Sequence, residues 1–179
     1  MLKAGSKTAT KDIDLVLREK KELESIILAL REIGFIQLEM QSQEELKRTA
    51  MHFQNSQGLK FDIFMKNIAG KLEFTESMRQ RAIPLSKLRN LKINRLSNED
   101  LFLLKSVSGR DIDLDDMSKL FQSGLDWEVV ISELTLQAEV TGRVWTVIFL
   151  DRMYDLEKEY DLRCPRLKEI SDLAQVQLS

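Results

Sequence analysis

The sequence has little of the side-chain chemistry that disulfide-bonded and zinc-binding domains require. Its single cysteine, Cys164, excludes an internal disulfide. Its single histidine, His52, leaves no set of cysteine and histidine ligands for structural zinc. An intracellular protein fits this composition best.

Long hydrophobic runs and a marked excess of one charge are also missing. The first residues lack the apolar run of a signal peptide, and no stretch approaches the roughly 18 apolar residues of a membrane span. Lys and Arg total 27 against 29 Asp and Glu, which gives a net charge of −2. This balance provides no global attraction to nucleic acid, so any such contact has to be local. We therefore expect a soluble, cytoplasmic protein that does not act at a membrane.

The chain has enough apolar sequence for a core of ordinary size, with 43% of its 179 residues hydrophobic. It contains no internal repeat and no low-complexity segment. The pattern changes from mixed strands and helices to helices alone after residue 95. It predicts a mixed α+β fold, with a small α/β core over residues 1–95 and a helical region over residues 96–179.

The first half of the sequence alternates in the manner of half-buried strands. In residues 12–17, apolar side chains occupy one face, while Asp12 and Asp14 lie on the other. Residues 59–65 alternate in the same way and include Asp62. A helix is predicted over 19–33, strands over 35–40, 47–54 and 59–65, with the last two forming a hairpin, and edge strands over 71–76 and 91–95.

The second half has helical spacing and recognisable helix caps. Ser97 is the predicted cap of a helix through Val107, and Asp126 caps a second helix that carries Trp127. Further helices are predicted over residues 143–160 and 166–178. The helical spacing of Trp127 and Trp145 favours packing in this region over stacking on nucleic-acid bases.

The tetrapeptide Asp-Ile-Asp-Leu occurs twice, and the two copies have different contexts. The second follows Gly109 and precedes a helical pattern, which places Asp113 at the N-cap and Asp115 and Asp116 in the first turn. Capping therefore explains the second copy better than metal binding does.

Capping explains less of the first copy, because its two aspartates share one face of a strand. Asp12 and Asp14 project in the same direction about 6.6 Å apart along the chain, a spacing that suits two-metal chemistry. Asp62, on another strand, offers a third carboxylate. The alternative places Asp12 at a strand edge and Asp14 in solvent, and spacing alone leaves both interpretations open.

Several motifs in order resemble the DNA polymerase beta-like nucleotidyltransferase superfamily. The segment Gly5-Ser6-Lys7-Thr8-Ala9-Thr10-Lys11-Asp12-Ile13-Asp14-Leu15 is similar to that family's G-x-x-R-x-T-x-D-I-D-L motif, and Lys60-Phe61-Asp62 is similar to the segment with the third acid. Residues 99–105 and 110–116 are similar to the E-D-L-x-x-x-K and R-x-x-D-x-x-D helix pair of a small prokaryotic branch that includes nucleotidyltransferase toxins of toxin-antitoxin pairs. The resemblance covers roughly residues 1–125.

This resemblance implies transfer of a nucleoside monophosphate from an NTP to a hydroxyl acceptor. It implies that Asp12 and Asp14 hold two Mg²⁺ ions and that Asp62 holds the second ion and helps to activate the acceptor. The acceptor it implies is tRNA, a protein or a small molecule. A further interpretation makes the C-terminal helices a surface for a second copy of the chain or for an antitoxin. Nucleotide-binding residues implied by the match are Gly5, Ser6, Lys7, Thr10, Lys105 and Arg110. The alternative for Lys105 and Arg110 is pairing with nearby aspartates on a solvated helix face.

The sequence departs from the family pattern at its beginning. Relatives usually carry a Gly-Gly or Gly-Ser turn upstream of the matched segment, whereas only four residues precede Gly5. Three explanations stay open: Gly5 and Ser6 form the phosphate turn, the true start lies upstream, or nucleotide binding is lost. In the last case the protein is a catalytically silent binding or regulatory relative. Lys7 also replaces a common Arg, and His52 is predicted to be a strand surface residue rather than a catalytic base.

Overall fold

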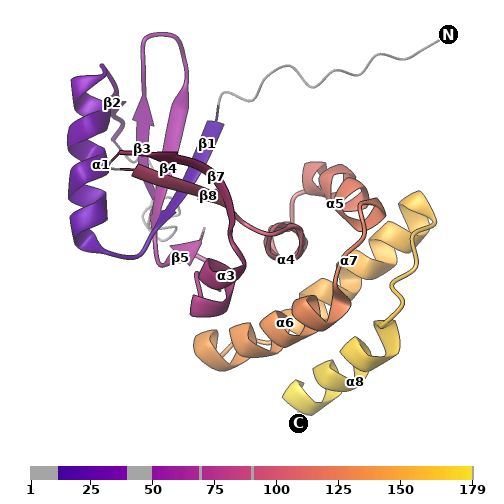
Figure 1. Cartoon of the computed structure of the whole chain (residues 1–179). Coiled ribbons are helices and arrows are strands. Elements are labelled where there is room, and N and C mark those ends of the chain that lie inside the picture. Colours follow the sequence, from indigo (N-terminus) through magenta and orange to yellow (C-terminus); the bar gives the residue numbers. More distant parts are fainter. Residues whose placement is uncertain (1–11, 40–49, 69, 90, 179) are drawn as a thin grey trace, which may run out of the picture. The chain divides into compact units, whose positions relative to one another are not determined.

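The computed structural model describes residues 12–39, 50–68, 70–89 and 91–178. The chain divides into two compact units, Met1–Phe74 (unit 1) and Thr75–Ser179 (unit 2). Unit 1 holds a mixed sheet with a helix, and unit 2 is mostly helical (Figure 1). The predicted α+β class is therefore confirmed. The predicted domain boundary between residues 95 and 96 stays a prediction.

Unit 1 is built on a four-stranded sheet with the strand order β1-β4-β3-β2. The inner strand β4 runs parallel to β1 and antiparallel to β3, which confirms the predicted hairpin. A small separate sheet pairs β5 with β6 and includes part of the edge strand predicted over residues 71–76. The bounds are β1 Asp12–Leu17, α1 Lys20–Glu32, β2 Ile36–Gln37, β3 Ala50–Gln54, β4 Lys60–Met65, β5 Asn67–Ile68 and β6 Leu72–Glu73.

One face of the sheet is apolar, and helix α1 packs against it (Figure 1). The buried members of this core are Leu30, Phe35, Phe53 and Ile63, surrounded by partly buried side chains from α1 and the strands. Alternation along β1 and β4 sends every second side chain into this core. The residues between them, which include the aspartates, consequently lie on the opposite face.

Unit 2 contains a short helix, a β-hairpin and five longer helices. The predicted helices over 97–107, 143–160 and 166–178 are confirmed as α4, α7 and α8 within a few residues. The segment 91–95 is a strand, but it pairs with β7 in a separate two-stranded sheet instead of joining an edge of the main sheet. The bounds are α3 Glu76–Arg81, β7 Ile83–Leu88, β8 Leu91–Arg95, α4 Asn98–Ser106, α5 Ile112–Gln122, α6 Trp127–Thr141, α7 Trp145–Tyr160 and α8 Leu167–Leu178.

An aromatic cluster lies at the centre of unit 2. The fully buried ring of Phe102 contacts Phe121, Trp127 and Phe149, with ring centroids 5.9 to 6.4 Å apart. Trp145 is 5% exposed at the start of α7. Both tryptophans therefore pack inside unit 2, as their helical spacing predicted.

A buried polar cluster holds α3 against α4 and α6. The guanidinium of Arg81 donates to Asp100 and to Glu133 at 2.6 Å each, and both carboxylates are almost fully buried. Thr75 also donates to Glu133, at 2.8 Å. Burial raises the pKa of Asp100, although the hydrogen bonds from Arg81 and Ser97 oppose that shift. This cluster explains why α3 packs with the helices that follow it.

Helix caps are confirmed at two of the three predicted positions. Ser97 accepts a hydrogen bond from the backbone of Asp100, and Asp126 accepts one from the backbone of Glu128. The predicted N-cap role of Asp113 is wrong, because α5 begins at Ile112 and Asp113 lies inside its first turn. None of the helices in the described ranges is both long enough and apolar enough to cross a membrane.

Candidate active site

The predicted acids lie on the face of the unit 1 sheet that is turned away from α1. In the parallel register of β1 and β4, Asp14 is opposite Asp62, and Asp12 is opposite Lys60. Residues in register on neighbouring strands project from the same face, with the strands about 4.8 Å apart. The fold thus brings Asp12, Asp14 and Asp62 together on one face.

Solvent reaches this group of acids. Asp12 and Asp14 are exposed, and the Asp62 side chain retains 32% of its exposure. The exposure of Asp14 agrees with the alternative interpretation of the sequence, in which Asp14 lies in solvent. Side chains of the opposite face, such as Ile63, point into the core beneath the acids. A charged ligand can therefore approach the carboxylates without displacing apolar side chains.

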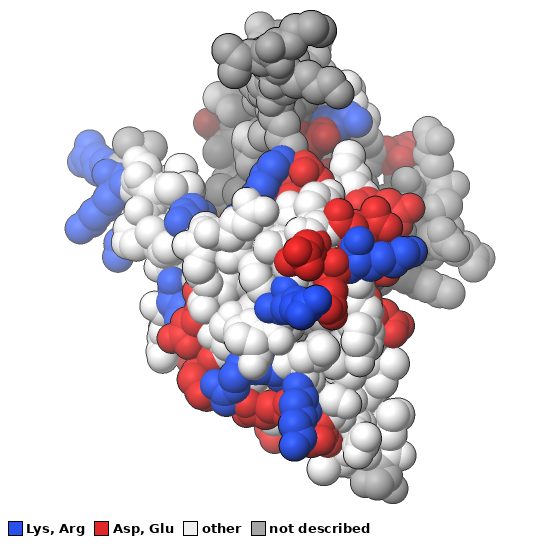
Figure 2. Space-filling view, turned by 90° about the vertical axis from the view of Figure 1, so that its right-hand side faces the viewer, with Lys and Arg blue, Asp and Glu red and all other residues white. Residues whose placement is uncertain are grey.

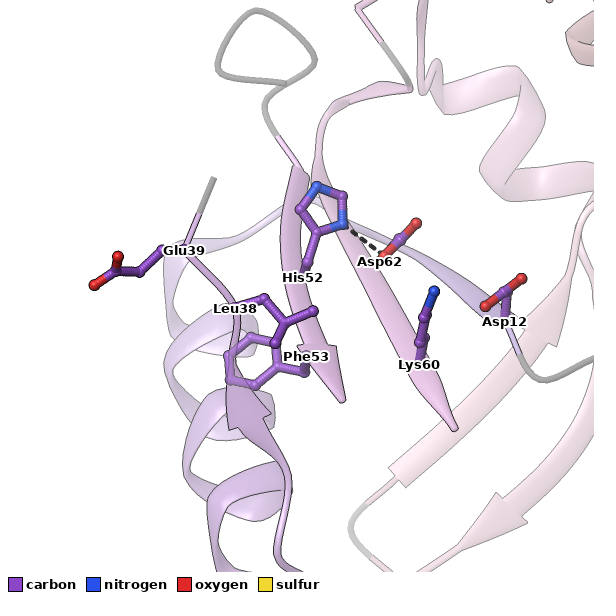
Figure 3. Close-up of a pocket in the computed structure, with 7 residues that line it drawn as sticks. All are labelled: Asp12, Leu38, Glu39, His52, Phe53, Lys60 and Asp62. Atoms are coloured by element: carbon purple, nitrogen blue, oxygen red, sulfur yellow. Dashed lines mark hydrogen bonds and ion pairs between the residues drawn. The ribbon is translucent and has the colours of Figure 1, made fainter. Parts of the chain in front are cut away.

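His52 is the neighbour that orients Asp62. It lies opposite Asp62 in the antiparallel β3–β4 pair, and its Nδ1 is 2.7 Å from Asp62 Oδ1 (Figure 3). Because an ionised carboxylate only accepts hydrogen bonds, Nδ1 is the donor in this pair. The prediction of a strand residue is confirmed, whereas its bond to Asp62 was not predicted.

A depression of about 420 Å³ is lined by Asp12, Asp62 and His52, but Asp14 is not among its lining residues. Figure 3 shows Asp12, Lys60, Asp62 and His52 on the same side of the strands, with the side chain of Glu39 directed away from them. The remaining lining residues are Leu38 and Phe53. The volume lies in the range of small-molecule sites, and an ammonium group beside carboxylates suits a ligand that carries both phosphates and metal ions.

The donor set fits a hard divalent cation. Carboxylate oxygens are the ligands that Mg²⁺ prefers, and it usually binds one or two of them together with substrate phosphates and water. Asp14 and Asp62 supply such a pair from adjacent strands, with Asp12 two residues along β1. In the described ranges, no three histidine, cysteine or acidic side chains are gathered into a preformed metal cluster. The metal triad stays a prediction.

The two predicted cationic contacts from the helical region lie in unit 2. Lys105 donates to Asp113 and Asp116 at 3.1 and 2.8 Å, and Arg110 donates to Asp113 at 2.7 Å. Pairing with nearby aspartates, the alternative from the sequence, thus describes their contacts in this structure. Their predicted nucleotide-binding role is untested. Four other predicted nucleotide-binding residues lie outside the described ranges: Gly5, Ser6, Lys7 and Thr10.

This ion pairing has a clear electrostatic effect. Although burial alone raises the pKa of the Asp113 carboxyl, hydrogen bonds from Arg110, Ser108 and Lys105 lower it to about 2. The pKa of Lys105 is raised, because its bonds to Asp116 and Asp113 outweigh the effect of its burial. The second Asp-Ile-Asp-Leu copy therefore joins α4 to α5, and this role replaces the predicted cap.

Sequence reasoning missed two residues on the acid face, Lys60 and His52. Lys60 is two residues before Asp62 on β4, so the sequence already indicated that both side chains project from the same face of the strand. The His52 contact depends on the register of the β3–β4 hairpin, in which Gln54 pairs with Lys60. Counting back from that pair places His52 against Asp62, so the hairpin prediction contained the signal.

A comparison with protein families finds a match over most of the chain. The model of the family described as "Nucleotidyltransferase of unknown function (DUF6036)" matches residues 1–144. The matched range contains all three acids and the α4–α5 ion pairs. No curated protein matches the chain.

Proposed function

The chain belongs to the nucleotidyltransferase family of unknown function (DUF6036), and from that premise we propose that it transfers a nucleoside monophosphate from an NTP to a hydroxyl acceptor. Asp12, Asp14 and Asp62 are the proposed metal ligands and catalytic residues. The proposed cofactor is Mg²⁺, because nucleotidyltransferases generally use divalent metal ions and the donors here are carboxylates.

The register between β1 and β4 is the observation that carries this proposal. It aligns Asp14 with Asp62 on the exposed face, with Asp12 on the same side of β1. Asp14 and Asp62 lie directly opposite each other on this face, and like charges in that position destabilise a sheet. A bound cation compensates for that cost.

Each polar residue of the face has a proposed task. Bound Mg²⁺ supplies charge stabilisation for the attacking and leaving oxygens, and the carboxylates of Asp12, Asp14 and Asp62 hold it in place. His52 fixes the Asp62 carboxylate through Oδ1, which leaves Oδ2 to face the ligand. Lys60 attracts the triphosphate, and Gly5, Ser6, Lys7 and Thr10 are proposed to contact it from the segment before β1.

Two finer parts of the proposal rest on the resemblance to the toxin branch: an antitoxin partner, and an acceptor among tRNA, proteins and small molecules. The proposed cytoplasmic location rests on the composition of the sequence, and the proposed homodimer rests on the C-terminal helices. The proposed nucleotide contacts of Lys105 and Arg110 also rest on the resemblance to the toxin branch. They require both side chains to leave Asp113 and to bind phosphate instead. Fold alone does not select among these acceptors.

The test is transfer of label from each α-labelled NTP, with Mg²⁺, into total RNA and total protein. Asp12→Asn/Asp14→Asn should lower transfer by at least about a hundredfold, since it removes negative charge that holds the metal. The control is Glu24→Gln/Glu32→Gln, which makes the same change in charge on the exposed side of α1. Binding of Mn²⁺ to both variants gives a readout that does not depend on turnover.

The possible results distinguish a wrong metal triad from a protein that binds NTP without catalysis. Full transfer by the Asp12→Asn/Asp14→Asn variant would show that the triad is wrong. Binding of an NTP with Mg²⁺ by the native chain, without transfer from any of the four nucleotides, would favour the silent binding protein over the enzyme.

A further inference from the structure

The segment between Glu76 and Glu99 has a charge composition unlike that of the rest of the chain. It contains no Asp or Glu, whereas the whole chain has a small negative net charge. Its six cations are Arg79, Arg81, Lys87, Arg89, Lys92 and Arg95. A surface formed by this segment therefore attracts acidic groups and repels basic ones.

Three of these cations form neither an ion pair nor a side-chain hydrogen bond in the part of the chain that the structure describes. They are Lys87, Arg89 and Lys92, whose side chains are exposed on the hairpin of β7 and β8 (Figure 1). By contrast, most basic groups on the face of the molecule that Figure 2 draws lie beside acidic ones. The hairpin therefore carries positive charge that no described neighbour neutralises.

The two faces of this hairpin differ in character. Lys87 lies directly opposite Lys92 in the antiparallel register, so both side chains project from one face, the lysine face. Leu91 and Ile93 alternate with Lys92 and project from the other side, the apolar face, where they are 41% and 36% exposed. A ligand that lies on one face alone cannot contact both sets of side chains.

The backbone of β8 is open to pairing along its outer edge. In the described ranges, β7 and β8 pair only with each other, so each strand has one unpaired edge. The edge of β7 is interrupted by Pro84, which has no backbone N–H, and by the bulge between Pro84 and Ser86. β8 contains neither feature, and its outward N–H and C=O groups can pair with a third strand.

A third strand is a ligand that reaches both faces at once, because its side chains project alternately to the two sides of a sheet. A second copy of this hairpin is a poor third strand. In an antiparallel pair of β8 strands, the lysines of both copies would gather on one face and repel each other. Lysines on edge strands commonly prevent such self-pairing. They do not oppose a strand with acidic side chains.

We propose that the outer edge of β8 binds an extended segment of a partner protein in which acidic and apolar residues alternate. The acidic side chains lie beside Lys92, with added attraction from Lys87, and the apolar side chains lie against Leu91 and Ile93. Main-chain hydrogen bonds supply affinity in this binding mode, and the alternate side chains supply specificity. This inference concerns a protein partner and does not depend on the proposed transfer activity.

The test measures binding of the full-length chain to a fluorescent peptide of about ten residues in which glutamate and valine alternate, a length that covers β8. Fluorescence anisotropy is recorded in EDTA, which removes metal ions that would bind the glutamates. The matched control peptide has the same composition, with all glutamates before all valines, and thus the same charge without the alternation. Two further peptides are methylated on the backbone nitrogens of the glutamates or of the valines, which removes the N–H donors from one edge of the strand.

The alternating peptide should bind at least about tenfold more tightly than the control peptide, and one of the two methylated peptides should lose binding while the other keeps it. Lys87→Gln/Lys92→Gln should weaken binding by about three- to fivefold, and so should Leu91→Thr/Ile93→Thr, which keeps residues that favour strands. Lys158→Gln/Lys168→Gln removes two exposed cations from α7 and α8 and should change nothing.

Three results would overturn the inference. The first is no binding of the alternating peptide by the native chain. The second is equal affinity for the two peptide orders, or equal loss in both lysine variants, which would reduce the attraction to charge alone. The third is equal affinity for a single-stranded RNA of similar length, which would identify a polyanion as the occupant. The peptide comparisons use the native chain, so they decide the matter even where a variant fails to fold.

Discussion

At the scale of single residues, the contact between His52 and Asp62 is the sharpest feature of the acid face. Both side chains are about one third exposed or less, so water screens their hydrogen bond only partly. Partners that orient ligand carboxylates typically change metal affinity or activity by 10- to 100-fold when they are replaced. We expect a loss of about this size in the rate of transfer by His52→Ala.

His52→Asn tests whether that effect comes from orientation. The asparagine side-chain amide can donate from near the position of Nδ1, so part of the lost rate should return, while the KM for NTP stays close to the native value. Rates are measured with saturating NTP, and urea unfolding checks that neither variant has lost its fold. Equal rates for the native, Ala and Asn proteins would remove His52 from the site.

At the scale of elements, the ion pairs of Asp113 join α4 to α5 through a carboxylate that is only 2% exposed. Its pKa of about 2 lies below the ordinary value of 3.8. A lowered folded-state pKa stabilises the protein above the unfolded-state pKa, and this contribution disappears as the pH falls through about 4 to 2. The difference corresponds to about 2 kcal/mol at neutral pH.

Asp113→Asn should therefore lower the free energy of unfolding by about 2 to 3 kcal/mol at pH 7, because it leaves Lys105 and Arg110 without their buried partner. The deficit relative to the native chain should shrink below pH 4. Urea unfolding followed by circular dichroism at pH 7 and at about pH 3 measures it. Asp115→Asn, whose exposed side chain pairs with Lys119 on the same helix, should have little effect. If Asp113→Asn lowers the free energy of unfolding equally at both pH values, the lost stability comes from packing and not from the ion pairs.

Helices and strands were predictable where the spacing of apolar residues in the sequence matches the side chains that pack in the core. The alternation of apolar and polar residues in β1 and β4 predicted both strands and placed the acids on one face of the sheet. The strand β7 was missed because Pro84 interrupts its pattern, and α3 was missed because six residues contain less than two helical turns. Asp113 was misplaced because Arg110 and Lys105, rather than backbone amides, are its partners. The sequence offered this pairing as an alternative, but spacing alone did not select it over a cap.

At the scale of the whole molecule, the open question raised by the two units is whether residues 75–95 fold with unit 1 or with unit 2. The sequence predicts that this segment belongs to the α/β core, and that boundary stays a prediction. In the structure the segment is grouped with unit 2, and its Met78 is fully buried. Both tryptophans, Trp127 and Trp145, lie in unit 2, so their fluorescence reports unfolding of that unit. Circular dichroism, by contrast, follows the loss of secondary structure in both units.

Met78→Ala should shift the fluorescence-detected unfolding transition by about 2 to 5 kcal/mol, the usual cost of removing a buried Met side chain. Phe53→Ala, in the core of unit 1, is the matched change and should shift the dichroism signal while leaving the tryptophan transition in place. If Met78→Ala instead leaves the fluorescence transition unchanged, residues 75–95 fold with the α/β core and the boundary lies at residue 95. If both variants shift both signals equally, the chain unfolds as one cooperative body, because separate cores cannot transmit the loss to each other unless they unfold together.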